Sequence, residues 1–335
     1  MKKYSVISLT DHSGHSKENS IYSILREMSM HDKCKEVFVA SRGLANNKQF
    51  FTEHQFDTII ANKVSQSFEY DPSGQQFSDD VSTVNLDDFD IIFLRLPRPV
   101  SDQFLSAIKA RFENKIFIND PEGIIECSSK AFLINFPSLC PPIQLCKSIE
   151  EIIEFSKKHD IVLKPLREYG GKGLLKISGD TINDGKNDHS TEKYLKSIEH
   201  EITSEGYLAM KFLKNVNQGD KRLIVVSGEI LASSLRLPPE GSWLCNVALG
   251  GKSVATEPTL EEKNIIETIN PLLKEKGILI YGADTLVDDN NKRVLSEINT
   301  LSIGGFPQAQ KQTGLPIIKI TLNKIFDYAH ERHTN

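Results

Sequence analysis

Oxygen-bearing side chains near the C-terminus have the types and spacing of a divalent-cation site. Two β-prone runs on either side of the turn-forming residues 288–291 predict a β-hairpin. Because side chains alternate across a strand, Glu297 and Asn299 share one face and Ile298 points to the other. Asp284, on the partner strand, faces the same way if the register suits. This trio predicts a site for a hard cation such as Mg²⁺; taken alone, it also fits a solvated polar strand face.

Arg222 and Arg236 form a second group that suits anions. Residues 220–227 and 229–237 are predicted to be neighbouring strands that turn at Gly228, so the two arginines should lie side by side. Each guanidinium offers a planar fork of donors that fits a carboxylate or a phosphate. For either arginine alone, a solvated surface residue is the competing interpretation.

A lysine at a strand end and a glycine-rich loop have the chemistry of a phosphate site. Lys164 ends the apolar strand 161–164, and Gly170-Gly171-x-Gly173 follows before a second strand at 174–177. Backbone N–H groups of such a flap can close over phosphates. The loop lacks the features of a Walker loop and the G-x-G-x-x-G spacing, and a plain hairpin turn is the alternative. The apolar run 207–213 offers backbone groups that can pair with the edge of an adenine ring.

Strands and helices alternate in the first part of the chain. Helical patterns at 20–30 and 101–112 lie among short apolar runs, which span 4–9, 36–40, 90–95 and 115–119. This alternation predicts a parallel sheet with ligands near the carboxyl ends of its strands, where Arg95 lies. Residues 46–88 show no clear periodicity of apolar residues, and we predict an irregular segment with two strands.

The later segments are predicted to be mixed. A helix over 123–136 carries Lys130 and ends at a group of prolines. A helix over 191–204 follows a polar surface loop at 178–190, and the last helix is predicted over 316–331.

Length and composition limit the class of protein. The 335 residues suit two or three domains, and 40 basic against 45 acidic residues give a net charge of -5. This charge provides no general attraction to nucleic acid or anionic membranes. Five cysteines without a Cys-x-x-Cys pair suggest reduced thiols, and no apolar run approaches membrane-spanning length. We therefore expect a cytoplasmic protein that binds neither nucleic acid nor membrane.

Several short motifs follow one another in a characteristic order. They are Lys130, Lys164, the glycine flap, the 210–213 linker, Asp220-Lys-Arg222 and Asp284…Glu297-x-Asn299. In this order the chain resembles the ATP-grasp superfamily and, within it, the bacterial glutathione synthetases. That family has nearly the same sequence at four segments of this chain: Ile161-Val-Leu-Lys-Pro-Leu, Gly219-Asp-Lys-Arg, Leu273-Lys-Glu-Lys-Gly and Glu297-Ile-Asn. The likeness covers most of the chain and is fainter in the first 120 residues.

The resemblance implies an α/β fold of the ATP-grasp type. A parallel-sheet domain (1–122) would precede a small lobe with the glycine flap (123–206) and a C-terminal lobe (207–335). The implied activity is ATP-dependent carboxylate–amine ligation through an acyl phosphate, with γ-glutamylcysteine and glycine giving glutathione.

The same resemblance implies a role for each site residue. Nucleotide-binding residues would be Lys130 and Lys164 on the phosphates, Gly170, Gly171 and Gly173 over them, Met210, Lys211, Phe212 and Leu213 on adenine, and Asp220 on ribose. Asp284, Glu297 and Asn299 would hold two Mg²⁺ ions, with Glu297 bridging and Mn²⁺ as a substitute. The acyl substrate would meet Arg222, Arg236, Asn246, Gly250 and Gly251, and Ser20 and Arg95 match substrate-side positions.

Departures from the family pattern leave the substrates open. After the Glu-x-Asn motif the chain has Thr300-Leu-Ser-Ile-Gly-Gly305 where the family has a Thr-Ser-Pro-Thr-like run. This loop should lie near the amine acceptor. The alternatives are therefore a ligase for another amino acid or peptide pair and a nucleotide-binding protein without turnover. The flap and the 237–249 loop are candidate lids. We expect small-molecule substrates and a homo-oligomer.

Overall fold

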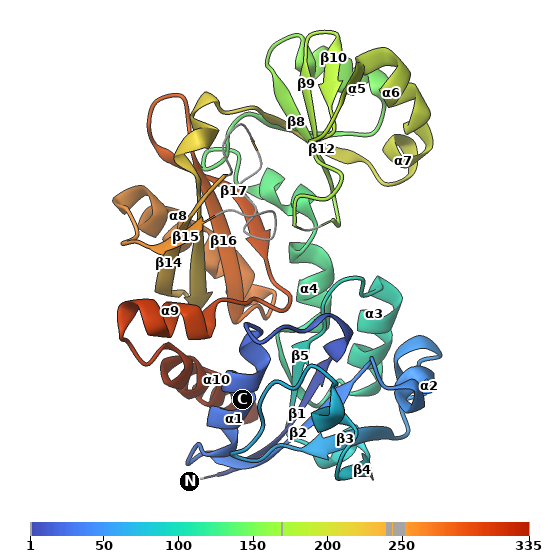
Figure 1. Ribbon diagram of the computed structural model, residues 1–335, viewed down its shortest axis with the longest axis vertical. Coiled ribbons are helices and arrows are strands. Elements are labelled where there is room, and N and C mark those ends of the chain that lie inside the picture. Colours follow the sequence, from blue (N-terminus) through green and yellow to red (C-terminus); the bar gives the residue numbers. More distant parts are fainter. Residues whose placement is uncertain (1, 169, 239–242, 244–251, 335) are drawn as a thin grey trace.

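Helices cover β-sheets in each part of the chain, as the predicted α/β class requires (Figure 1). The computed structural model describes residues 2–168, 170–238, 243 and 252–334. Within these residues the strands form three sheets, and no helix has the length and apolar character needed to cross a bilayer.

The first sheet has the strand order β4-β3-β2-β1-β5-β6. Its strands are β1 (Tyr4–Thr10), β2 (Cys34–Ser41), β3 (Ile59–Lys63), β4 (Val81–Val84), β5 (Ile91–Arg95) and β6 (Ile116–Ile118), with helices α1 (Ser20–Ser29), α2 (Lys48–Thr52) and α3 (Asp102–Arg111). Strands β2, β1, β5 and β6 are parallel, as predicted. The two strands predicted within 46–88 are β3 and β4, which extend the sheet in antiparallel fashion.

The second sheet is antiparallel, with the order β11-β10-β9-β8-β12-β7. It consists of β7 (Ile143–Cys146), β8 (Ile161–Pro165), β9 (Leu175–Ser178), β10 (Thr181–Asn183), β11 (Asp188–Ser190) and β12 (Tyr207–Lys211), flanked by α5 (Ile149–Ser156), α6 (Thr191–Ser197) and α7 (Glu199–Ser204). The predicted loop 178–190 contains the β10–β11 hairpin, whose turn is held by Asp184 accepting the N–H groups of Lys186 and Asn187. The predicted helix 191–204 is broken at Ile198.

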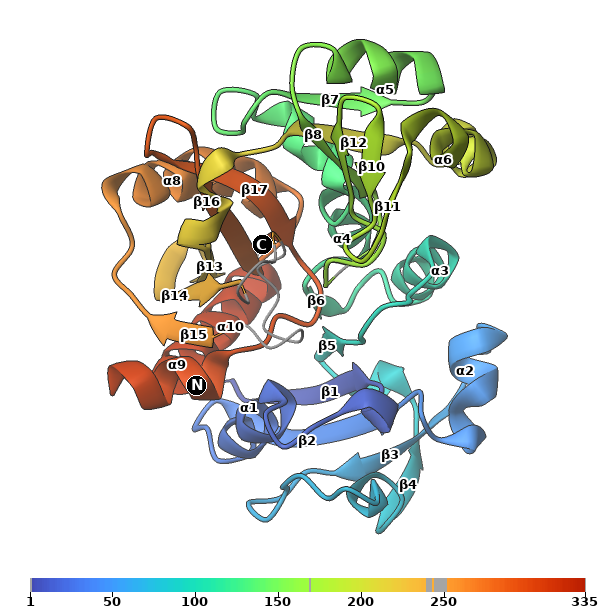
Figure 2. The ribbon, with the colours of Figure 1, turned by 45° about the horizontal axis from the view of Figure 1, so that its top comes forward.

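The third sheet is also antiparallel, with the order β15-β14-β13-β16-β17 (Figure 2). Its strands are β13 (Asp220–Val226), β14 (Glu229–Leu237), β15 (Lys252–Ala255), β16 (Ile280–Val287) and β17 (Arg293–Asn299). Helix α8 (Leu260–Glu275) covers one face, where Ile265 and Ile269 join Tyr281 and Leu295 in a buried core. Helices α9 (Phe306–Thr313) and α10 (Ile317–Thr334) follow, and α10 packs beside α1. The sequence analysis did not identify α9.

The segment that carries Lys130 differs from its predicted form. Helix α4 (Pro121–Cys127) ends early, and a separate 3-10 turn, η5 (Lys130–Asn135), begins after Ser129. The Ser129 side chain accepts the N–H of Ala131 and so caps the second turn. The predicted continuous helix 123–136 is therefore wrong. The segment is divided into α4 and η5, and Lys130 is the first residue of η5.

Asn119, directly after β6, joins the first sheet to the third. Its side chain accepts the N–H groups of Leu279 and Ile280 at 2.8 Å. It also donates to the carbonyls of Ile280 at 2.6 Å and Thr300 at 2.7 Å. Nearby, a Cβ on Gly123 would lie 1.9 Å from the Lys276 carbonyl oxygen, so only glycine permits this approach. These contacts hold the two sheets together.

Candidate active site

A cavity of about 160 Å³ lies between the second and third sheets. Most of the predicted nucleotide, metal and anion residues line it: Lys164, Gly170, Gly171, Met210, Lys211, Phe212, Leu213, Asp220, Arg222, Arg236, Asp284, Glu297 and Asn299. Residues far apart in the sequence thus meet at one place.

A β-bulge in β17 gives the carboxylates a common direction. Asp284 pairs with Glu297 and Thr285 pairs with Leu295, so Ser296 is an extra residue on β17. Leu295 is buried in the core that contains the α8 side chains, whereas Ser296 and Glu297 both line the cavity. With regular alternation from Leu295, Glu297 and Asn299 would turn toward α8. The predicted hairpin is confirmed; the bulge was not foreseen.

Asp284 is buried, with 3% of its surface exposed, beneath two guanidinium groups. Arg222 binds both of its carboxylate oxygens, with Nη2 at 2.7 Å from Oδ2. Arg236 places Nη2 2.9 Å from Asp284 Oδ2 and also forks onto Asp220. Burial opposes ionisation of Asp284, but Arg222 and Arg236 outweigh it and lower its pKa to about 2. Burial raises the pKa of Asp220 to about 6, although Arg236 opposes the change.

Two lysines reach the same hairpin from the side of the second sheet. Lys164 Nζ donates to the Ser296 carbonyl at 3.1 Å, so the bulged residue provides its acceptor. Lys130 Nζ lies 3.6 Å from Glu297 Oε1 and donates to the Glu168 carbonyl at the base of the flap. Burial lowers the pKa of Lys164 below that of an ordinary lysine.

The other end of the cavity is mainly apolar. Val162, Leu174, Leu286 and Val216 line it together with the 210–213 linker and Trp243. The Phe212 and Trp243 rings lie 6.4 Å apart, edge to face. The N–H groups of Lys211 and Phe212 donate to the carbonyls of Pro142 at 2.9 Å and Asp160 at 2.7 Å. Those two donors are therefore committed, and an adenine ring would have to use the neighbouring backbone groups.

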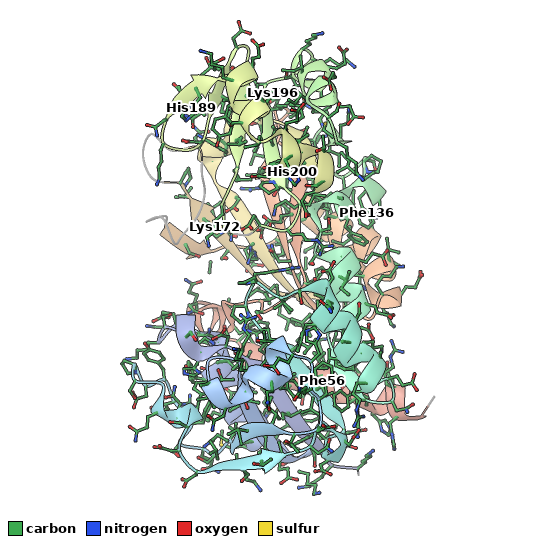
Figure 3. All side chains as sticks on the ribbon, turned by 90° about the vertical axis from the view of Figure 1, so that its right-hand side faces the viewer. Phe56, Phe136, Lys172, His189, Lys196 and His200 are labelled. Atoms are coloured by element: carbon green, nitrogen blue, oxygen red, sulfur yellow. The ribbon has the colours of Figure 1, made fainter. Side chains whose placement is uncertain are left out.

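The glycine flap connects β8 and β9. Gly170, Gly171 and Gly173 have φ of 67°, 78° and 67°, in the left-handed region that favours glycine. Figure 3 places Lys172, between two of these glycines, on the lower side of the small lobe, whereas His189 and Lys196 lie at its upper end. Gly170 and Gly171 line the cavity, and Gly173 is not among its lining residues in the described part of the chain.

The remaining predicted residues lie elsewhere. Arg95 and Ser20, from the first sheet and α1, meet the loop that follows Asn299. Arg95 Nη2 donates to the Ile303 carbonyl at 2.7 Å, and Ser20 Oγ accepts the N–H of Phe306 at 3.4 Å. Burial lowers the pKa of Arg95 to about 10. Asn246, Gly250 and Gly251 lie outside the described residues. Ser296 and Trp243 are among the cavity residues that the sequence analysis missed.

The oxygen donors fit Mg²⁺ in type and number. Mg²⁺ in phosphate-transfer sites commonly uses one or two carboxylates, with substrate phosphates and water as the other ligands. Asp284 and Glu297 are such carboxylates, and the side-chain nitrogen of Asn299 donates to Asp284 Oδ2 at 3.4 Å, which places its amide beside them. Within the described residues no group of three His, Cys, Asp or Glu side chains forms a complete metal cage. A cation here would depend on phosphate oxygens and would compete with Arg222 and Arg236 for Asp284.

Comparisons with known proteins agree with this arrangement. The family model for the ATP-grasp domain of prokaryotic glutathione synthetase matches residues 129–314. The glutathione synthetase of Bradyrhizobium diazoefficiens is 31% identical over 227 residues, 66% of this chain and 67% of that protein. The glutathione synthetase of Agrobacterium fabrum is 30% identical over 274 residues, 80% of this chain and 82% of that protein.

Solved structures show the same fold. D-cycloserine synthetase matches with a TM-score of 0.64 and 9% identity over 96% of this chain and 99% of that one. D-alanyl-alanine synthetase A of Vibrio cholerae matches with a TM-score of 0.60 and 14% identity over 98% of this chain and 99% of that one. At these identities the likeness concerns the fold alone.

Proposed function

Because the chain belongs to the prokaryotic glutathione synthetase family of ATP-grasp ligases, we propose that it joins γ-glutamylcysteine to glycine, with ATP converted to ADP and phosphate. The observation that carries this proposal is the meeting of Lys164, the flap and the hairpin carboxylates in one cavity. Members of the family form a peptide bond between amino acid or peptide substrates. The particular pair is the proposed part.

The chemistry proceeds in two stages. A carboxylate is a poor electrophile, so its oxygen first attacks the γ-phosphorus of ATP, ADP leaves, and an acyl phosphate forms. The amine then attacks the acyl carbon, the amine loses a proton, and inorganic phosphate leaves with the carboxylate's former oxygen. Both stages depend mainly on positioning and on balancing negative charge.

The cationic side chains divide this work between the two reaction partners. Lys164, from the second sheet, and Lys130, from η5, face the hairpin and would hold the phosphates. Arg222 and Arg236 would orient the acyl carboxylate and its phosphorylated form, because their forks fit both groups. Asp284, Glu297 and Asn299 would hold two Mg²⁺ ions, with Mn²⁺ as a substitute. These ions would offset the charge of the triphosphate.

The acyl phosphate must be protected from water. The glycine flap lines the cavity at Gly170 and Gly171, and its backbone can close over phosphates. Its base is tied to Lys130 through the Leu166 and Glu168 carbonyls. We propose that the flap excludes water during the reaction. The second candidate lid, 237–249, lies largely outside the described residues.

The test combines product analysis with a binding measurement. Incubation with ATP, Mg²⁺, γ-glutamylcysteine and glycine should release phosphate and form the tripeptide, detected by mass. Trp243 is the only tryptophan of the chain and lines the cavity, so its fluorescence should report nucleotide binding without either peptide substrate. Phosphate release only with another amino acid or peptide pair would assign the protein to a different ligase, the second candidate, which the unusual 300–305 loop favours. Nucleotide binding with no product from any pair would contradict both.

A further inference from the structure

A buried carboxylate lies on the opposite face of the third sheet from the cavity. Glu262, in the first turn of α8, has 0% of its surface exposed. Its oxygens accept from Lys221 Nζ at 3.1 Å, Thr285 Oγ1 at 2.7 Å and the Thr259 N–H at 2.8 Å. Arg293 Nε lies 3.9 Å away. One side chain therefore contacts β13, β16 and β17 from behind.

Its partners are direct sequence neighbours of the cavity residues. Lys221 lies between Asp220 and Arg222 on β13, and Thr285 follows Asp284 on β16. Lys221 and Thr285 are also paired across the two strands. Because neighbouring side chains on a strand point to opposite faces, fixing Lys221 and Thr285 behind the sheet fixes the residues in front of it.

The contact with Thr285 lies at the bulge. The change of register falls between Asp284 and Thr285, opposite the extra residue Ser296. Ser296 lines the cavity, and its Oγ donates to the Asp284 carbonyl at 3.0 Å. Behind the sheet, Thr285 Oγ1 is held by Glu262. Loss of the bulge would turn the metal-face side chains of β17 toward α8, so this register needs support from both faces.

Helix capping alone does not account for this arrangement. In the capping box of α8, Thr259 accepts the Glu262 N–H, and Glu262 returns a bond to the Thr259 N–H. That exchange occupies Glu262 Oε2. Oε1 is bound to Thr285, and Oε2 also receives the Lys221 ammonium. A cap residue needs neither of these bonds.

We propose that Glu262 is a positioning residue that, through Thr285 and Lys221, holds the bulge in register and so sets Asp284 and Glu297 for a divalent cation. The inference rests on the proposed function in one respect, because it assumes that these carboxylates bind Mg²⁺ with the nucleotide. Supporting side chains of this kind typically change metal affinity about 10- to 100-fold when removed.

The test compares variants that separate positioning from capping. Glu262→Gln removes the charge at nearly constant volume, and Thr285→Val removes only the hydroxyl that contacts it. Thr259→Ala removes the cap acceptor, and Glu261→Gln changes the exposed neighbour of Glu262 as the matched control. For each, the Mg²⁺ dependence of ADP binding is followed by Trp243 fluorescence and the melting temperature is measured.

We expect Glu262→Gln and Thr285→Val to raise the half-saturating Mg²⁺ concentration about tenfold. Thr259→Ala should lower the melting temperature without changing the Mg²⁺ dependence, and Glu261→Gln should also leave the Mg²⁺ dependence unchanged. If Glu262→Gln does not fold, Thr285→Val decides. Wild-type Mg²⁺ dependence in Thr285→Val would overturn the proposal. The readout uses no peptide substrate, so a shift in Mg²⁺ dependence without glutathione formation would reject the proposed substrates and leave the role of Glu262 standing.

Discussion

Asp284 and Glu297 should differ in what their loss does to stability, although both are proposed metal ligands. Asp284→Asn removes the negative charge of a buried carboxylate that balances two guanidinium groups. Breaking a buried pair from one side costs about 3–5 kcal/mol. Arg236 retains Asp220, so we expect the lower limit, about 3 kcal/mol. For 335 residues, at about 2.1 cal/mol/K of unfolding entropy per residue, that corresponds to a fall of roughly 4 °C in melting temperature.

Glu297→Gln should behave differently. The Glu297 side chain is 24% exposed, and its ion pair with Lys130 spans 3.6 Å. Lys130 is buried but keeps the Glu168 carbonyl as an acceptor, so the loss of the pair should cost no more than about 1 kcal/mol, or roughly 1–2 °C. Turnover should nevertheless fall about 10²-fold or more in both variants, since each loses a charge at the phosphate end of the cavity.

Thermal unfolding followed by circular dichroism and phosphate release under saturating substrates would test this contrast. If Asp284→Asn melted within about 1 °C of the wild type, where we expect a fall of about 4 °C, the buried ion pairs would not carry the assigned stability. Near-normal turnover of Glu297→Gln would show that this carboxylate is not a metal ligand. Equal destabilisation by both variants would also refute the reasoning, because burial and pairing would then not determine the cost.

Three further results are expected. Arg222→Ala should raise KM for the acyl substrate about tenfold or more, because a charged hydrogen bond to the substrate is lost, and KM for ATP much less, because Arg236 still pairs with Asp284. An unchanged acyl KM in steady-state assays would contradict it. Burial lowers the pKa of His15 to about 4, so its contribution to stability is complete above about pH 6.5 and is lost as the pH falls through 4. The fall in melting temperature between pH 7 and pH 5 should therefore be smaller in His15→Gln, and equal falls would exclude this effect. Arg167→Ala removes the exposed ion pair with Asp102 that links the base of the flap to α3. It should weaken ATP binding without lowering the melting temperature, and high salt should have the same effect on the wild type. Unchanged ATP affinity in a fluorescence titration would argue against such a link.

The hairpin and the paired arginine strands could be predicted because their signals are local. Alternating side chains and turn residues identified β16 and β17, and Gly228 marked the turn between β13 and β14. The bulge at Ser296 could not be predicted in this way. Ser296 is a small polar residue in an otherwise regular strand, and its carbonyl and hydroxyl are held by Lys164 and Asp284. Contacts between distant segments, which no local pattern encodes, set this register.

The break before Lys130 and the course of α9 have similar causes. Periodicity extended one helix across 123–136, but the side chain of Ser129 caps a new turn instead. The glycines at 304–305 suggested a loop, and Gly305 in fact precedes α9 with a φ of 93°. In both places a capping or left-handed residue ends one element and starts the next, which the hydrophobic pattern does not show.

The central strands of the third sheet carry polar side chains toward both faces. A strand buried on two sides is normally apolar throughout, yet β13 begins Asp220-Lys221-Arg222 and β16 contains Asp284-Thr285. Each buried charge lowers stability unless a partner offsets its desolvation. On the face toward the cavity the arginines pair with the aspartates, and on the face toward α8 Lys221 and Thr285 bind Glu262. The two clusters share the same backbone, so a change in one must displace the other, and residues remote from the substrates should affect metal and nucleotide binding.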